Sequence, residues 1–346
     1  MATLSFAVPT WNRANELRQC LTELCRQTEN RDGFEVVVYD NASTDETPKV
    51  CDEFANRYSH FSFRRGKQYF DFQDSFANAF AMPKTEWTWM FGDDDLLVDG
   101  AVDVALDVIG RFPENVFFHF PEISRSDSSK KLYQGQFMDI ACAIGIVDFS
   151  GFISGNLIKT DLLQAGLSSR NKAVYDRCAF PQSLIILESC IGKQAGFLDI
   201  PLIRLQNVEQ KEETVNRWIA YNIMLRYNYL VDGLEVLRDQ GKIPRHMPIE
   251  FFRYLGGNLF GKILHTFYQM FQRDHVTPRD YDWERLLAMA DFIDDKHRAL
   301  MKEAITLYRG TMKSYQENLE SQERIIKELD AAFLMAIPDT YPFNYV

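Results

Sequence analysis

Short hydrophobic runs alternate with amphipathic stretches over the first 120 residues of the chain. Five runs have the length and the β-branched or aromatic content of buried strands, namely 4–8, 34–39, 61–63, 87–91 and 116–120. Between them, four stretches have the pattern of helices, namely 17–24, 46–58, 75–82 and 99–110. Strands that alternate with helices predict an α/β domain with a mainly parallel sheet.

The pattern changes along the second half of the chain. A capped helix is expected at 160–167 and an edge strand at 198–205. Strand signals vanish from about residue 212, so a boundary near 210 is predicted, with residues 1–210 as one domain and 211–346 as a helical extension. Within the extension, the apolar periodicity predicts four helices, at 218–237, 248–271, 283–292 and 297–333.

The last of these helices bears on oligomerisation. It carries Leu319, Ile326, Leu329 and Phe333 at heptad-like intervals, too few to establish a coiled coil. The aromatic face of 248–271 and the end segment 333–337 fit either contact with a membrane surface or burial. Because acidic residues are spread through 280–330, we expect burial and self-association through these helices, with peripheral membrane contact as the alternative.

Composition narrows the class of protein. With 46% hydrophobic and 14% aromatic residues, the 346-residue chain can bury a sizeable core. The net charge of -11 argues against non-specific binding of nucleic acid. The six cysteines form no CxxC pair, the N-terminus enters a strand directly, and no uncharged apolar run is long enough to span a bilayer. These features predict a cytoplasmic protein, at most peripheral to the inner face of the membrane.

Polar clusters follow three of the expected strands. Thr10 to Arg13 follow the first strand, Asp40 to Asp45 the second, and Asp93 to Asp95 the run 87–91. In parallel α/β sheets, ligands bind beyond the carboxyl ends of the strands. The three clusters are therefore expected to meet in one cleft.

The acidic triplet Asp93, Asp94 and Asp95 suggests a metal site. Adjacent carboxylates repel one another and are costly to desolvate, so a fold that places them at a strand end usually supplies a cation. Hard oxygen ligands suit Mg²⁺ or Mn²⁺, which keep positions open for substrate phosphates. The alternative is a solvated turn that caps the following helix.

Three motifs together resemble a known family. Ala7-Val-Pro-Thr-Trp-Asn-Arg13, Val38-Tyr-Asp-Asn-Ala-Ser-Thr-Asp45 and Trp89-Met-Phe-Gly-Asp-Asp-Asp-Leu96 are similar to the successive motifs of GT-A-fold nucleotide-sugar glycosyltransferases of the large second sequence family. The Gly-Asp-Asp-Asp form resembles abequosyltransferase-like members, which act on bacterial surface glycans. The resemblance covers about residues 4–205 and implies a GT-A-like catalytic domain. The helical extension at 211–346 lies outside the resemblance, and we expect it to serve acceptor binding, oligomerisation or both.

The resemblance also implies roles for individual residues. Pro9, Thr10 and Arg13 fall where the family lines the nucleotide pocket. Asp40 matches the acidic residue that binds the base or ribose, and Asn41, Ser43 and Asp45 shape its loop. For Asp40 to Asp45 the alternative is a turn that caps the helix at Glu46.

Other residues match the donor side of the family pocket. The stretch Tyr69, Phe70, Phe72, Gln73 matches the entry of the donor-side helix, where Asp74 or Asn78 can contact the nucleotide. The aromatic residues are interpreted as core or acceptor wall. Trp87 and Trp89 are interpreted as core.

The metal motif departs from the family form. The usual pattern is Asp-x-Asp-Asp, and its first Asp aligns with Gly92. Asp94 and Asp95 are favoured as ligands of Mn²⁺ or Mg²⁺, and Asp93 is assigned to the donor site. The cation would neutralise the diphosphate of the donor.

The general base is the weakest match. Inverting members carry an acidic residue, often Glu-Asp, that deprotonates the acceptor hydroxyl. Asp176 matches it without the preceding Glu, so a surface ion pair with Arg177 is an equal alternative, and inversion or retention stays open. The six histidines have no zinc spacing, and His119 is interpreted as structural.

The predicted function is therefore a metal-dependent glycosyltransferase. Its donor would be a nucleoside-diphosphate sugar, and its acceptor would be a bacterial glycan. A lipid-linked glycan is favoured as the acceptor. Two alternatives stand beside it. A sugar nucleotidyltransferase should have a glycine-rich phosphate loop after the first strand, which Pro9 to Arg13 lacks. A glycan- or nucleotide-binding module would have lost its catalytic base.

Overall fold

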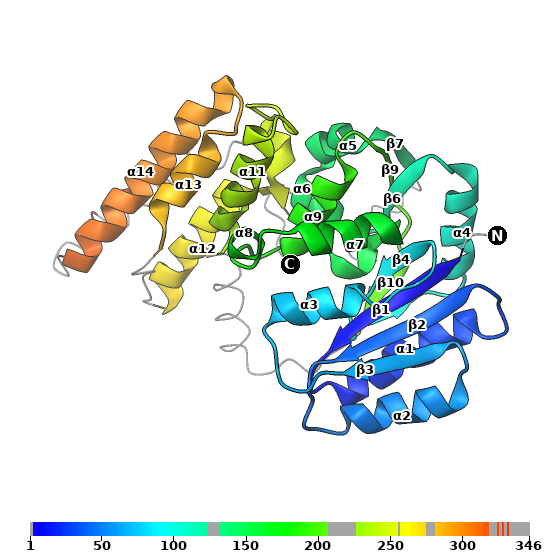
Figure 1. Ribbon diagram of the computed structural model, residues 1–346. Helices are drawn as coiled ribbons and strands as arrows, with labels where there is room; N and C mark the ends of the chain where they lie inside the picture. Colours follow the sequence, from blue (N-terminus) through cyan, green and yellow to red (C-terminus); the bar gives the residue numbers. More distant parts are fainter. Residues whose placement is uncertain are drawn as a thin grey trace. The chain divides into compact units, whose positions relative to one another are not determined.

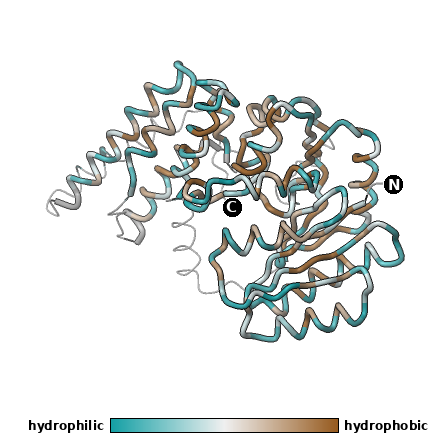
Figure 2. Tube along the Cα trace, viewed as in Figure 1, coloured by the Kyte–Doolittle hydropathy of each residue, from teal (hydrophilic) through white to brown (hydrophobic). Residues whose placement is uncertain are grey.

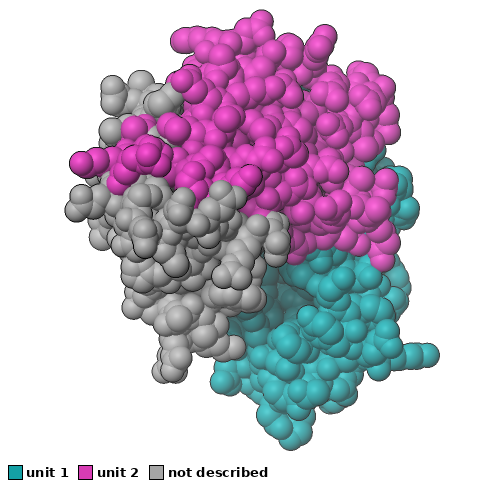
Figure 3. All heavy atoms as spheres, turned by 90° about the vertical axis from the view of Figure 1, so that its left-hand side faces the viewer, with its two compact units in different colours: residues 1–140, 149–170, 185–209 teal, residues 141–148, 171–184, 210–346 magenta. Residues whose placement is uncertain are grey.

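The chain forms two compact units. The computed structural model describes residues 3–122, 132–206, 226–254, 257–274 and 281–317, and the single positions 324, 327, 328 and 331. One unit comprises residues 1–140, 149–170 and 185–209, and the other comprises 141–148, 171–184 and 210–346 (Figure 3). The second unit thus contains two short segments that precede the boundary expected near residue 210, and the domain division stays a prediction.

An eight-stranded sheet forms the frame of the first unit (Figure 1). Its strands are β1 (Leu4–Thr10), β2 (Phe34–Asp40), β3 (Phe61–Arg65), β4 (Trp87–Met90), β6 (Asn115–His119), β7 (Leu132–Gln136), β8 (Asn156–Lys159) and β9 (Gln194–Leu198). They lie in the order β3-β2-β1-β4-β8-β6-β9-β7. Strands β3, β2, β1 and β4 are mutually parallel, as are β6 and β9, whereas β8 and β7 run antiparallel to their neighbours. The expected mainly parallel α/β sheet is confirmed.

Helices flank this sheet. Those within the first unit are α1 (Ala14–Thr28), α2 (Thr47–Arg57), α3 (Phe72–Phe80), α4 (Ala101–Arg111) and α7 (Thr160–Ser169), with the 3₁₀ turn η1 (Ile153–Gly155). Three more cross the division between the units, namely α5 (Phe137–Ile144), α6 (Ile146–Ser150) and α9 (Pro181–Cys190). Apolar residues of α1 recur every three or four positions and are buried.

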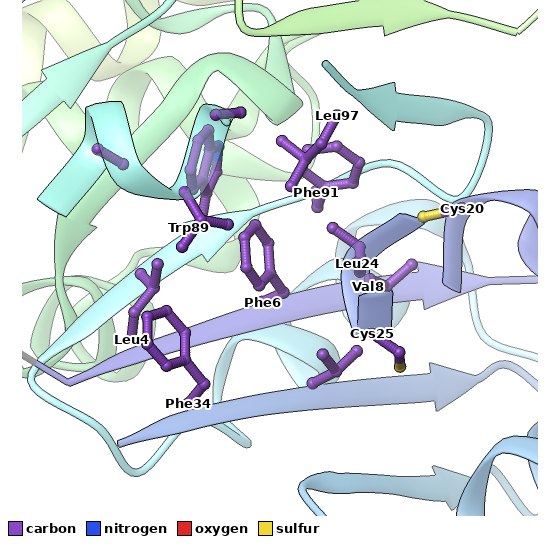
Figure 4. Packing of buried hydrophobic residues seen from close by; sticks show 14 of the residues in the cluster. Leu4, Phe6, Val8, Cys20, Leu24, Cys25, Phe34, Trp89, Phe91 and Leu97 are labelled. Atoms are coloured by element: carbon purple, nitrogen blue, oxygen red, sulfur yellow. The ribbon is translucent and has the colours of Figure 1, made fainter. Parts of the chain in front are cut away.

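Aromatic side chains fill the core between the sheet and α1 (Figure 4). Phe6 of β1 stacks on Trp89 of β4 with ring centroids 5.1 Å apart, and it meets Phe91 edge-on at 5.9 Å. Trp87 is also fully buried, as predicted. The central strands are correspondingly hydrophobic along their length (Figure 2). This core fixes the strand ends from which the candidate site is built.

A second, two-stranded sheet lies in the same unit. Strand β5 (Asp95–Leu97), which the sequence did not predict, pairs antiparallel with β10 (Ile203–Leu205). The single strand expected at 198–205 is therefore wrong, since β9 ends at Leu198 and β10 belongs to another sheet. Pro201 lies between them and has no N–H to donate to a continuous ladder.

The second unit is mainly helical in its described residues. Its elements are α8 (Lys172–Tyr175), η2 (Tyr227–Tyr229), α11 (Leu230–Asp239), η3 (Ile249–Phe252), β11 (Arg253–Tyr254), β12 (Gly257–Asn258), α12 (Leu259–Asp274), α13 (Trp283–Ala290) and α14 (Asp295–Glu317). The continuous helix expected at 248–271 is wrong. A 3₁₀ turn and a two-stranded hairpin replace its first half, where the Gly256-Gly257 pair disfavours a helix.

The expected last helix is described only in part. α14 ends at Glu317, so most of the segment to residue 333, including its four heptad-like positions, lies outside the described residues. Apolar positions of α12 are buried, as for Phe260, Leu264 and Phe267. In the part of the chain that the structure describes, no helix has the length and apolar character needed to cross a membrane.

Candidate active site

The three polar clusters lie at one edge of the sheet. Strands β1, β2 and β4 are parallel, and Thr10 and Asp40 are direct partners in the β1–β2 ladder. Their carboxyl ends open onto a cavity of about 350 Å³ within the first unit. The cavity is lined by Pro9, Thr10, Trp11, Arg13, Asn41, Tyr69, Phe72, Ser75, Gly92, Asp93, Asp94 and Ile153. The convergence expected from the sequence is therefore present for parts of all three clusters.

Two hydrogen-bond donors hold the Asp93 carboxylate in place at the cavity. The Thr10 hydroxyl donates to its Oδ2 at 2.7 Å, and Arg13 Nη1 donates to its Oδ1 at 3.1 Å. Burial raises the pKa of Asp93 to about 7, and the Arg13 guanidinium acts in the opposite direction. Asp93 thus joins the first strand to the acidic loop.

Asp94 is the accessible carboxylate of the triplet. Its side chain is 38% exposed, against 10% for Asp93. Arg13 Nη1 donates to Asp94 Oδ2 as well as to Asp93, and the Arg13 side chain is itself 45% exposed. One guanidinium therefore balances two carboxylates at the mouth of the cavity.

Asp95 lies deeper and has a different partner. Its Oδ2 accepts a hydrogen bond from the Ser154 hydroxyl, on the turn η1 before β8. Burial raises the pKa of Asp95 to about 7, the bond from Ser154 lowers it, and the charges of Asp94 and Glu122 raise it further. A positive ion beside Asp95 would offset the cost of ionising this buried group.

Gly92 explains the departure from the usual acidic motif. A Cβ at this position would lie 2.9 Å from Asp95 Oδ2, 3.1 Å from Asp94 Oδ1 and 3.3 Å from Ser154 Oγ. A fourth carboxylate here would collide with the other two. Glycine instead lets these three oxygens lie close to the backbone of the loop. Carboxylate oxygens are ligands that a hard divalent cation prefers.

A bound ligand would complete the coordination of a cation at this donor set. Among the described residues, no group of three or more histidine, cysteine, aspartate or glutamate side chains is arranged to hold a metal ion. Mg²⁺ sites in phosphate-using enzymes commonly have one or two carboxylates, and substrate phosphates and water complete the shell. Asp94 and Asp95 fit that pattern.

The turn after β2 is more self-contained. The Asp40 side chain is fully buried, accepts from the Ser43 backbone N–H at 2.9 Å and pairs with Arg65 Nε at 3.3 Å. Ser43 Oγ accepts from the Asn12 N–H at 2.9 Å. Asp40 and Ser43 therefore shape the rim from below, and only Asn41 of this turn borders the cavity. Their predicted contact with a nucleotide stays a prediction.

Asp45 has the capping role that was weighed for it. Its carboxylate accepts from the Thr47 N–H at 2.9 Å and from the Ala14 N–H at 3.2 Å. These two donors lie at the starts of α2 and α1, where helix N–H groups have no intrahelical partner. Asp45 thus links the first turns of two helices next to the site.

Three aromatic side chains form one wall of the cavity. Trp11, Tyr69 and Phe72 are 47%, 56% and 47% exposed. The rings of Trp11 and Tyr69 are in contact, with centroids 4.8 Å apart. Tyr69 and Phe72 are therefore not core residues, because apolar periodicity does not show which face of a short loop meets solvent. The alternative interpretation, an acceptor wall, stays a prediction. Exposed aromatic rings at a cavity are suited to stacking on a planar or sugar ligand.

The other expected residues do not border this cavity. Asp74 pairs with Arg170 of α7 at 3.3 Å, and Asn78 donates to the Tyr39 hydroxyl at 3.2 Å. His119 is buried against Asn156 and stacks on Phe197, which agrees with a structural role.

Asp176 belongs to the second unit, at the end of α8. Its backbone carbonyl and that of Arg177 accept hydrogen bonds from Arg226, which fixes this turn. Its assignment as general base stays a prediction.

Two residues that support the acidic loop were missed. Ser154 bonds to Asp95, and the side chain of Gln206 donates to the Glu16 carbonyl at 2.9 Å while its N–H donates to the Asp94 carbonyl at 3.1 Å. Both are remote in sequence from the loop. No motif marked either residue.

Comparison with known proteins agrees with this geometry. Residues 5–158 match the family model of glycosyl transferase family 2. Abequosyltransferase RfbV of Salmonella typhimurium is 28% identical over 102 residues, which is 29% of this chain and 31% of the relative. The chain therefore matches only about a third of the length of that curated relative.

Solved structures share the fold. TarS of S. aureus superposes with a TM-score of 0.54 at 15% identity, covering 90% of this chain and 55% of that one. Its residues 1–349 in complex with UDP give 0.55 at 14% identity, covering 91% of each chain. The mannosyltransferase PcManGT from Pyrobaculum calidifontis, in complex with GDP-Man and Mn²⁺, gives 0.52 at 16% identity, covering 97% of this chain and 86% of its own.

The fold is that of GT-A glycosyltransferases. Residues 5–158 are similar to glycosyl transferase family 2, and the resemblance that the three motifs indicated is confirmed.

Proposed function

We propose that this protein transfers a sugar from a nucleoside-diphosphate sugar to a glycan acceptor, with a divalent cation at Asp94 and Asp95. The observation that carries the proposal is the cavity at the ends of β1, β2 and β4. It combines an accessible carboxylate, a half-exposed arginine and an aromatic wall within about 350 Å³. These are the groups that a diphosphate, its counter-ion and a planar base require.

The aromatic side of the cavity suits the nucleoside. Trp11 and Tyr69 offer exposed ring faces, and base–aromatic stacking contributes about 1–3 kcal/mol per base. Asn41 lies beside them, with its side chain oriented by the Phe70 backbone at 2.8 and 3.0 Å. Asp40 supports this rim and takes part in base or ribose recognition if the turn opens slightly.

The acidic side of the cavity suits the diphosphate. Mn²⁺ or Mg²⁺ between Asp94, Asp95 and the diphosphate would supply Lewis-acid stabilisation of the leaving group. Arg13 is within reach of the same region and can donate to phosphate oxygens once it leaves Asp94. Structural neighbours in complex with UDP, with UDP-GlcNAc, or with GDP-Man and Mn²⁺ are consistent with this division.

The acceptor half of the reaction rests on fewer observations. Asp176 is the proposed base that takes the proton from the acceptor hydroxyl, and the transition state is oxocarbenium-like. The similarity to an abequosyltransferase supports a bacterial surface glycan as the acceptor. We favour a lipid-linked glycan. A cytoplasmic location and self-association through the C-terminal helices complete the proposal.

A donor panel tests this function directly. The purified protein is incubated with UDP-, GDP-, CDP- and dTDP-sugars and Mn²⁺, and release of the nucleoside diphosphate is measured with and without glycan acceptors. We expect one donor to be hydrolysed slowly alone and faster with an acceptor, and Asp94→Asn to abolish both. Binding of a donor without turnover would favour the binding module instead, and release of pyrophosphate from a sugar phosphate and a nucleoside triphosphate would favour a nucleotidyltransferase.

A further inference from the structure

Ser154 connects the acidic loop to the turn before β8, the strand next to β4. It is fully buried on η1, 59 residues from Asp95 in sequence. Its hydroxyl donates to Asp95 Oδ2 and accepts from the Gly92 backbone N–H at 2.8 Å. Its own carbonyl accepts from Trp89 Nε1 at 2.8 Å. Ser154 is thus bonded to the strand before the loop, to the first residue of the loop and to its last carboxylate.

These bonds determine which way the Asp95 carboxylate faces. A serine hydroxyl has one proton, and here it is given to Asp95 Oδ2 while a lone pair receives the Gly92 N–H. The same Oδ2 atom lies 2.9 Å from the position that a Cβ on Gly92 would occupy. Asp94 Oδ1 lies 3.1 Å from the same position, so the hydroxyl holds the Asp95 oxygen on the side of the loop where an Asp94 oxygen also lies.

We propose that Ser154 is a positioning residue that fixes the orientation of the Asp95 carboxylate and so sets the affinity of the site for a divalent cation. The inference rests on the proposed function, because it takes Asp94 and Asp95 as the ligands of the cation. It assigns to a residue outside every sequence motif a role in metal selection. Residues behind a metal ligand typically change metal affinity about 10–100-fold when they are replaced.

A selective loss distinguishes positioning from simple support of the fold. Ser154→Ala removes the hydroxyl but keeps the backbone carbonyl that receives Trp89 Nε1, so the packing of β4 is retained. A matched control is Thr88→Val, which breaks the buried Thr88–Thr160 hydroxyl bond of 2.8 Å on the same strand without touching the loop. Ser154→Cys keeps the size of the side chain with a weaker donor.

The experiment measures Mn²⁺ binding by titration calorimetry and electron paramagnetic resonance, with the nucleoside diphosphate that the wild type binds. For Ser154→Ala we expect the Kd for Mn²⁺ to rise at least ~10-fold. Nucleotide affinity in EDTA should stay within twofold, and in turnover the KM for Mn²⁺ should rise while kcat at saturating metal is retained. Ser154→Cys should lie between, and Thr88→Val should bind Mn²⁺ as the wild type does.

The possible outcomes separate the inference from the proposed function. A folded Ser154→Ala protein whose Mn²⁺ affinity stays within twofold of wild type overturns the inference alone. An equal loss in Thr88→Val also overturns it, because the effect would then come from general destabilisation. A wild-type protein that binds nucleotide but no Mn²⁺ contradicts the metal assignment, and the positioning role falls with it.

Discussion

Two acidic turns end neighbouring strands of the same sheet, yet they differ in what their carboxylates can do. After β2, Asp40 is fully buried and is balanced within the turn by the Ser43 N–H and by Arg65. After β4, Asp94 keeps a side chain 38% exposed to the cavity and shares one arginine with Asp93. In the first turn, neighbouring groups of the protein balance the carboxylate. The second turn retains excess negative charge at a cavity.

This difference separates a supporting role from a binding role. A carboxylate whose partners are all internal contributes mainly to the shape of the turn. The second turn has three neighbouring carboxylates, of which only Asp93 and Asp94 share the Arg13 guanidinium. An external cation can offset the remaining negative charge.

The largest effect is expected from Asp94→Asn. The change keeps the shape of the side chain and removes the accessible charge, so loss of the cation should lower the transfer rate roughly 10²-fold or more. Because the side chain is partly exposed, thermal stability should change little. Steady-state assays and a melting curve of the same preparation check both parts. Undiminished Mn²⁺-dependent turnover would remove Asp94 from the site.

The acidic loop should also make stability depend on pH in the metal-free protein. The pKa values of Asp93 and Asp95 are raised to about 7, so the folded state holds protons that the unfolded state loses near pH 4. Stability contributed by these protonated groups is present at low pH and is lost as pH rises from about 4 to about 7.

At about 1.4 kcal/mol per pKa unit, this loss amounts to a few kcal/mol. Denaturant titrations in EDTA at several pH values check it, and Asp95→Asn should flatten the profile. Saturating Mn²⁺ with nucleotide should offset the loss at pH 7. A metal-free profile that is already flat between pH 4 and 7 would contradict the burial argument.

Asp40→Ala tests the opposite side of the comparison. Loss of the bonds to Ser43 and Arg65 should destabilise the fold by ~1–3 kcal/mol. If Asp40 also reaches base or ribose, nucleotide binding should weaken by ~1.5–3 kcal/mol for each hydrogen bond lost. Calorimetry at a temperature where the variant is folded separates the two. A binding loss below ~0.5 kcal/mol would confine Asp40 to the turn.

The smallest effect concerns Arg13. Its guanidinium competes with a cation for Asp94, so Arg13→Met should strengthen binding of Mn²⁺ alone by the ~0.2–1 kcal/mol typical of exposed ion pairs. The same change should weaken binding of nucleoside diphosphate. Arg18→Met is the matched control, because Arg18 of α1 forms an exposed ion pair with Glu53 of α2. A parallel shift in both variants would point to net charge alone.

The strands that carry the site could be predicted, but much of the remaining sheet could not. β1, β2 and β4 are rich in apolar residues and buried along almost their whole length, which is typical of strands buried on both faces. β7 has a mostly exposed sequence with a glycine, and β8 has four residues, so neither gives a clear period. Their pairing comes from tertiary contacts.

The candidate site shows a similar division. The carboxylates could be found because strand ends in a parallel sheet converge. Ser154 and Gln206 could not be found, because the residues that they bond in the loop are 59 and 113 positions away along the chain. The exposure of Trp11 and Tyr69 likewise depends on how two loops meet rather than on local composition.

We have proposed that donor and cation bind together at the acidic strand edge. A thermal-shift screen of nucleoside diphosphates with and without Mn²⁺ tests it most directly, because a ligand that binds only the folded state raises its melting temperature. We predict a clear rise in melting temperature with one nucleoside diphosphate and Mn²⁺, and a much smaller rise in EDTA. Asp94→Asn should show no metal-dependent rise. Equal stabilisation of wild type and Asp94→Asn, or none of the wild type by any nucleotide, would contradict it.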